Sequence, residues 1–298
     1  MATPDVVNPV DFTRHVAVAP PAGLDRKQGQ HNVRTVMNYY KDPEDGSAPT
    51  PFYVDRPAAP QIESRPVISV PVEVTDISGS ENKYTLDSHG FQLVHHESQE
   101  KGFVDEDQIK SNYYSEIEQL LKDTTGANRV LIFDHTIRRE QPGIPDAPIR
   151  GPVRSVHIDQ SYAASVDRVR YHLPDEADEL LQKRFQIINV WRPIKTVLKD
   201  PLGVADAHTV AESDLIGAAL IYPQRKGETY VVKPNPAHRW YFKYAQRPDE
   251  VTLIKCYDSV IAPGVARRVP HSAFVDSAEE DKEPRESIEV RTLVFYDN

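Results

Sequence analysis

Hydrophobic residues along most of this chain follow the short runs that are typical of β-strands. Two runs, 66–76 and 90–98, precede a helical segment, and a longer β-rich part begins at residue 129. That part contains about nine runs with turn-forming residues between them: 129–139, 153–159, 185–194, 214–223, 227–234, 238–245, 250–259, 267–275 and 287–297. Many short strands, with no internal repeat and no heptads, favour a β-sandwich or a closed jelly-roll barrel.

Two segments carry helix signals. In 105–127, Asp105 is placed to cap the N-terminus, Gln108 follows three residues later, and Gly126 is placed to end the helix. The apolar stripe of this helix consists of Ile109, Tyr113, Ile117, Leu120 and Leu121. The segment PDEADELLQKRF, 174–185, is the only predicted helix within the β-rich part.

The N-terminal segment differs in composition from the rest of the chain. Residues 1–60 are crowded with Pro, Asp and Gly and show no sustained period, which predicts an extended arm that wraps the core. Residues 61–298 are then one β domain with helical insertions. The arm has two alternative roles, a lid across the barrel mouth or a contact with the second subunit of a homodimer.

Composition and charge narrow the function. A formal charge of -10 and a pI near 5.6 argue against nucleic acid as a partner, because phosphate binding needs clustered Lys and Arg. The single cysteine, Cys256, excludes an internal disulfide and a structural zinc site with two thiolates, and its strand context predicts a buried residue. The N-terminus lacks the basic start and apolar run of a signal peptide, and LIGAALIY is too short to cross a membrane. We therefore expect a cytoplasmic protein without membrane contact.

The segment VRSVHID raises the first chemical hypothesis. Residues two apart on a strand point to the same side, so His157 and Asp159 can both face a barrel interior. An oxygen-activating ferrous site needs two imidazoles and one carboxylate, which leave positions open for a chelating co-substrate and O2. His271, on a later predicted strand, supplies the second imidazole.

A dicarboxylate co-substrate also needs a cation that can hold its far end. Arg285 and Ser287 follow His271 and lie on one strand face, which offers one guanidinium and one hydroxyl donor. Arg291 lies on that face too if the strand is unbroken. We favour Arg285 as the clamp and keep Arg291 as the alternative.

Other interpretations compete with this site. Taken alone, His157 and Asp159 are better explained as a hydrogen-bonded pair at a strand edge, and the downstream His, Arg and Ser in order favour the metal site. A rival His-x-Glu, His95 and Glu97, lies before the first helix, far upstream of the other β segments. No G-x-S-x-G elbow surrounds Ser161, which argues against a serine hydrolase.

Several segments together resemble a known family, the fungal AsaB-type hydroxylase/desaturase family, which is similar to gibberellin desaturase and to CmcJ of cephamycin methoxylation. The resemblance runs in collinear order from about residue 33 to the C-terminal end, and its segments are TVMNYYKDPEDGS, KYTLDSHGFQLVHHES, FDHTIRR, VHIDQSY, NVWRPI, HRWYF, LIKCYDS, PHSAF and RESIEVRTLVFYD. It implies a mainly β protein with flanking helices and a double-stranded β-helix (jelly-roll, cupin-like) core.

The resemblance also implies an enzyme, a non-haem iron dioxygenase that uses Fe(II), 2-oxoglutarate and O2. His157, Asp159 and His271 would bind the metal, and Arg285 would hold 2-oxoglutarate, with Arg291 as the competing assignment. The expected reaction hydroxylates or desaturates an unactivated carbon of a small secondary metabolite, with succinate and CO2 as co-products.

Two other functions stay open at this point. The CmcJ relatives suggest a non-catalytic β-barrel subunit that assists another biosynthetic enzyme. A hydrolase that binds zinc through the same three ligands is the third hypothesis.

Overall fold

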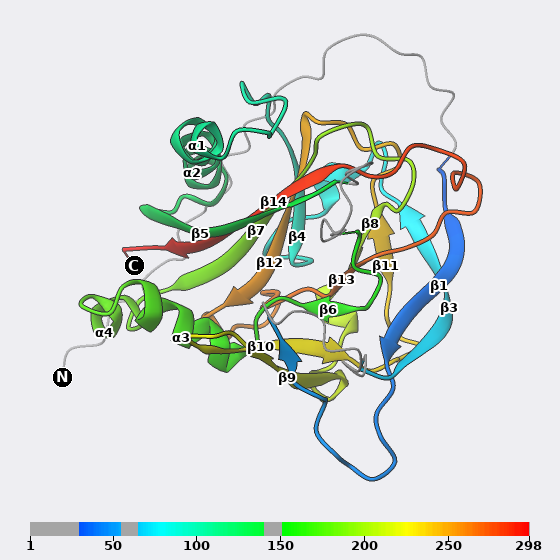
Figure 1. Ribbon diagram of the computed structural model, residues 1–298, viewed down its shortest axis with the longest axis horizontal. Helices are drawn as coiled ribbons and strands as arrows, with labels where there is room; N and C mark the ends of the chain where they lie inside the picture. The colour runs from blue at the N-terminus through cyan, green and yellow to red at the C-terminus, as the bar shows by residue number, and fades with distance from the viewer. Residues whose placement is uncertain (1–29, 55–64, 140–150, 298) are drawn as a thin grey trace, which may run out of the picture.

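Two sheets form the core of the protein in the computed structural model, which describes residues 30–54, 65–139 and 151–297 (Figure 1). The larger sheet has nine strands, in the order β1 (Val33–Tyr40), β3 (Val67–Asp76), β11 (Trp240–Phe242), β8 (Leu202–Ala205), β13 (His271–Ala273), β6 (His157–Ile158), β10 (Lys226–Val232), β9 (Leu215–Ile221) and β2 (Phe52–Tyr53). The second sheet has five, in the order β4 (Phe91–His95), β12 (Glu250–Asp258), β7 (Phe185–Pro193), β14 (Ser287–Phe295) and β5 (Arg129–Arg138). This arrangement confirms the predicted double-stranded β-helix.

Strand β7 shows why its sequence is apolar without a break. Ile187 and Trp191 pack into the core between the sheets, whereas Ile188 and Val190 pack into a second cluster on the opposite face. All nine residues of the strand are buried, since both of its faces are covered. Cys256 in β12 is buried as well, as its strand context predicts.

The cover on the outer face of the smaller sheet is the predicted first helix, which lies beside β5 and β14 in Figure 1. It consists of α1 (Glu106–Gln108), a π-helical turn (Ile109–Tyr113) and α2 (Tyr114–Thr125). The Asp105 side chain accepts hydrogen bonds from the backbone of Asp107 and Gln108, and Gly126 ends α2 with a φ of 73°. Both termini of the helix therefore lie where their capping residues predict.

Helix α3 (Tyr162–His172) is absent from the predictions, which placed only one helix in the β-rich part. Its buried residues are Ala164, Ser165, Arg168 and Val169, so no continuous apolar stripe marks it. Ser161 caps it by accepting a hydrogen bond from Ala164 N. The second predicted helix is shorter than expected: α4 spans Ala177–Leu180.

Part of the predicted arm belongs to the larger sheet. Strand β1 pairs along its whole length with β3, although its sequence, VRTVMNYY, lies within the segment predicted as irregular. The short β8, LGVA, was also not predicted, since four residues between turns carry no period. The predicted boundary near residue 60 falls within 55–64, outside the described residues, and stays a prediction. None of the helices in the described part of the chain is long and apolar enough for a membrane span.

Candidate metal centre

The three predicted metal ligands lie together at the interior face of β6 and β13. His157 begins β6, Asp159 follows its end, and His271 begins β13. Antiparallel pairing sets His271 opposite His157, with their ring centroids 4.4 Å apart. Asp159 Oδ1 lies 3.4 Å from Nε2 of His157 and 3.9 Å from Nε2 of His271. One ligand atom from each residue lies within 4.8 Å of the others, which is compatible with metal–ligand bonds of about 2.1 Å.

Hydrogen bonds with neighbouring groups determine which atoms of these side chains are left to bind a metal ion between them. His157 Nδ1 lies 2.7 Å from the Ser155 carbonyl oxygen. Because a carbonyl only accepts, this contact selects the tautomer of the neutral ring in which Nδ1 carries the proton and Nε2 has the lone pair. Asp159 Oδ2 accepts hydrogen bonds from Asn189 Nδ2 at 2.8 Å and from Arg291 Nε at 2.7 Å. Oδ1 is thereby left for a metal ion.

Burial and nearby charges keep Asp159 and His271 in the protonation states that metal binding needs. Burial alone would raise the pKa of Asp159, but the charge of Arg291 and the two neighbouring imidazoles hold it well below its usual range. Burial and the adjacent His157 lower the pKa of His271 to about 3. The carboxylate is therefore ionised and the His271 imidazole neutral at physiological pH.

Two neutral imidazoles and one carboxylate on one side of a point are the donor set of ferrous oxygenase sites. A structural zinc site would require a fourth protein ligand. Among the described residues, this triad is the cluster of His, Cys, Asp and Glu side chains with metal-binding spacing. The residues present fit Fe(II).

Arg291 lies beside the ligand triad, on the interior face of β14. It donates to Asp159 and lies 2.7 Å from Glu289 Oε1. Its Nη1 reaches Thr136 Oγ1 at 2.9 Å and Asp134 at 3.2 Å. With these partners its guanidinium is already engaged by protein carboxylates.

Arg285 differs from Arg291 in its partners. It is buried, its Nη1 donates to the Asp200 carbonyl at 2.9 Å, and its guanidinium lies 5.5 Å from the centre of the Trp191 ring. Its Nε is buried without a hydrogen-bond partner among the described residues. Burial and the nearby charge of Arg138 lower the pKa of Arg285 to about 10. Ser287, two residues later, begins β14 and is buried too.

The rival His-x-Glu pair lies elsewhere, at the end of β4. His95 Nδ1 lies 3.7 Å from Asp249, and Glu97 pairs with Lys101 at 3.8 Å. These partners are half-exposed or exposed surface groups. The structure does not bring this pair to the triad.

Asn189 and Glu289, which lie beside the triad, were not among the site residues predicted from the sequence. Asn189 is the single polar residue in the middle of FQIINVWRPI, and Glu289 stands between Ser287 and Arg291 on the same strand face. A polar residue at an interior position of a buried strand is the signal that could have identified both.

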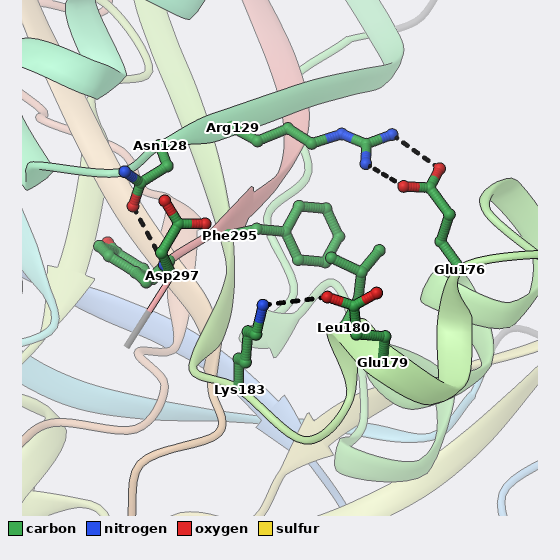
Figure 2. Close-up of a pocket in the computed structure, with 9 residues that line it drawn as sticks. Asn128, Arg129, Glu176, Glu179, Leu180, Lys183, Phe295 and Asp297 are labelled. Atoms are coloured by element: carbon green, nitrogen blue, oxygen red, sulfur yellow. Dashed lines mark hydrogen bonds and ion pairs between the residues drawn. The ribbon is translucent and has the colours of Figure 1, made fainter.

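A separate cavity of about 180 Å³ lies between β5, α4 and the end of β14 (Figure 2). Four of its charged groups form two pairs: Arg129 donates two hydrogen bonds to Glu176, and Lys183 pairs with Glu179. None of the triad residues lines it. We assign no function to this cavity.

The fold and the triad together define a protein of the 2-His-1-carboxylate class built on a double-stranded β-helix. A family model described as an oxidoreductase/YMDC permease-like domain matches residues 37–295. The chain is 36% identical to the hydroxylase/desaturase efuI of Hormonema carpetanum over 89% of this chain and 96% of that protein. It is 31% identical to the hydroxylase/desaturase asaB of Aspergillus flavus, over 90% of this chain and 97% of that protein.

A solved structure is also similar. The iron and alpha-ketoglutarate-dependent endoperoxidase NvfI superposes with a TM-score of 0.77 at 28% identity, over 89% of this chain and 98% of that one. The chain belongs to the fungal hydroxylase/desaturase family that includes asaB, and the resemblance drawn from its sequence is confirmed.

Proposed function

We propose that this protein is an Fe(II)- and 2-oxoglutarate-dependent oxygenase that hydroxylates or desaturates a small secondary metabolite. The observation that carries the proposal is the meeting of two imidazoles and one carboxylate from β6 and β13. The names of the relatives, which include hydroxylases/desaturases and an alpha-ketoglutarate-dependent dioxygenase, support the same chemistry.

In this proposal, His157, Asp159 and His271 hold the metal through Nε2, Oδ1 and Nε2. Ferrous iron bound there would supply open coordination positions for 2-oxoglutarate and O2, and so couple the oxidation of an unactivated carbon to the conversion of 2-oxoglutarate to succinate and CO2. The chain itself fixes the ligands: Ser155 sets the tautomer of His157, and Asn189 with Arg291 holds the second oxygen of the carboxylate.

Arg285 and Ser287 would bind the far carboxylate of 2-oxoglutarate. A buried guanidinium with an unsatisfied Nε is costly, and an incoming carboxylate removes that cost through charge-assisted hydrogen bonds. Arg291 is the weaker candidate because Asp159 and Glu289 already neutralise it.

Anaerobic absorption spectroscopy on the full chain tests the proposal. Fe(II) plus 2-oxoglutarate should produce a weak visible charge-transfer band, and air should then yield succinate. We expect Asp159→Ala to lose both signals and His95→Ala to keep them. Arg285→Gln should raise the 2-oxoglutarate concentration for half-maximal signal about 10–100-fold, as expected for a lost hydrogen bond to a charged group.

Other outcomes would decide against parts of the proposal. Absence of both signals in the iron-loaded wild type would favour the non-catalytic subunit. A co-substrate defect in Arg291→Gln with normal behaviour of Arg285→Gln would reverse the clamp assignment. The homodimer and the cytoplasmic location remain predictions. Size-exclusion chromatography with light scattering tests the homodimer, and localisation of the tagged chain tests the cytoplasmic location.

A further inference from the structure

A group of cationic and aromatic side chains lies next to the metal centre and takes no part in it. Arg168 and His172 come from α3, which begins three residues after Asp159, and Arg225 comes from the turn between β9 and β10. The aromatic members are Phe133 of β5 and Tyr222 of the same turn.

Arg168 is the buried member of the group. It is only 9% exposed, and its one hydrogen bond, from Nε to Gln160 Oε1, is long at 3.4 Å. Its guanidinium lies 4.7 Å from the centre of the Phe133 ring. Across the described ranges, no carboxylate forms an ion pair with it and neither terminal nitrogen has a hydrogen-bond partner. A buried cation in this state lacks the counter-charge that such groups normally have.

Arg225 and His172 share this lack of partners. Arg225 stacks on the Tyr222 ring at 3.7 Å, and the described part of the chain offers its guanidinium no hydrogen bond or ion pair. His172 stacks on Phe133 with ring centroids 5.2 Å apart, and its buried Nε2 has no hydrogen-bond partner within the described residues. Burial and the charges of Arg168 and Arg225 lower the pKa of His172 to about 4.

The group is connected to the metal centre at two points. Gln160, which contacts Arg168, is the residue directly after the Asp159 ligand. Asp134 attracts Arg168 and His172, but it already accepts a hydrogen bond from Arg291. Phe133 and Asp134 also line a surface cavity of about 430 Å³. Neither the triad nor Arg168, Arg225 and His172 line this cavity, so the cationic group is connected to the metal centre through Gln160 and Asp134.

We propose that Arg168, Arg225 and His172 form a subsite for a carboxylate group of the substrate, with Phe133 and Tyr222 as its apolar walls. This inference rests on the proposed oxygenase function and specifies its substrate class: a small molecule with a carboxylate attached to an apolar body. Two guanidinium groups bind the carboxylate oxygens, the rings contact the adjoining carbons, and the chemistry takes place at a more distant carbon.

Ligand-observed saturation-transfer NMR tests the subsite on the full chain loaded with zinc(II) and 2-oxoglutarate, since zinc prevents turnover. The probes are benzoate and its neutral counterpart benzamide. We expect the wild type to bind benzoate at least tenfold more tightly than benzamide. Arg168→Gln and Arg225→Gln should each weaken benzoate binding about tenfold or more, because each removes one charge-assisted contact. Arg225 lies on a turn, so its variant remains informative if Arg168→Gln does not fold.

Two matched variants make the outcome specific. Arg170→Gln, on the same helix with an exposed side chain paired to Asp167, should leave benzoate binding unchanged. Arg285→Gln should also retain it, and excess 2-oxoglutarate should not displace benzoate. Equal binding of benzamide, unaffected Arg168→Gln and Arg225→Gln variants, displacement by 2-oxoglutarate, or no binding of benzoate would each overturn the subsite. The charge-transfer band and succinate formation of the wild type are measured separately, so failure of the subsite differs from failure of the oxygenase function.

Discussion

Removing the Arg291 cation behind Asp159, a candidate metal ligand, should destabilise the metal-free protein strongly. In Arg291→Gln, Asp159 loses a donor at 2.7 Å and Glu289 loses its ion-pair partner at 2.7 Å. The three side chains are only 13–15% exposed, so water cannot fully replace the lost contacts.

The magnitude follows from that burial. Breaking a buried ion pair by removing one partner typically costs about 3–5 kcal/mol, because the remaining charge is left uncompensated. The low pKa of Asp159 means that its ionised form contributes stability above the pKa of an unfolded aspartate, about 3.9, and that this contribution is lost as the pH falls further. At pH 7 the effect is present in full, and we expect Arg291→Gln to lower the free energy of unfolding by about 3–5 kcal/mol.

Urea unfolding in EDTA, followed by circular dichroism, measures this loss. Arg34→Gln is the control, because its pair with Glu73 is exposed and should contribute nothing measurable. In Glu289→Gln/Arg291→Gln, part of the stability should return, with a coupling of about 0.5–3 kcal/mol. A loss below about 1 kcal/mol in Arg291→Gln, or no coupling with Glu289→Gln, would refute the view that this guanidinium compensates buried carboxylates.

Three further predictions concern other parts of the molecule. The pKa of His172 is about 4 in the folded protein instead of 6.5, so its contribution to stability is complete above pH 6.5 and is lost as the pH falls towards 4. Between these pH values the free energy of unfolding of His172→Gln should therefore fall less steeply than that of the wild type, by at most about 1.4 kcal/mol per pH unit. Identical pH profiles of the two proteins would contradict the pKa shift. Asp105→Ala should cost about 1 kcal/mol in urea unfolding, since it removes the cap of α1, whereas Asp105→Asn should cost much less. Burial raises the pKa of the Cys256 thiol well above its usual range, so a thiol reagent should modify the unfolded chain and not the native one; rapid labelling of native protein would show that β12 is accessible.

The sequence predicted most elements that carry a local signal. The first helix followed from its capping residues and apolar stripe, and the strands of the smaller sheet followed from their apolar runs. It missed α3 because that helix buries Arg168 and Ser165 where a stripe would have apolar residues. It missed β1 because pairing with β3, and not composition, makes that segment a strand.

The candidate ligands were also chosen from the sequence, through the i, i+2 spacing of His157 and Asp159 and the later His271. Residue types and their spacing along one strand are local properties, which can be read directly from the sequence. Whether two strands more than a hundred residues apart become neighbours depends on sheet pairing, and only the pairing of β6 with β13 places His271 against His157.

The different partners of the two arginines are likewise set by tertiary structure. In the sequence, the even spacing of Arg285 and Arg291 would put both on one face of an unbroken strand, so spacing cannot distinguish them. In the structure Arg285 precedes β14, which begins at Ser287. In the folded protein Arg291 meets Asp159 and Glu289, whereas Arg285 retains an unsatisfied buried donor. The charge around a side chain comes from segments distant in the chain, and for that physical reason it is set by the fold as a whole.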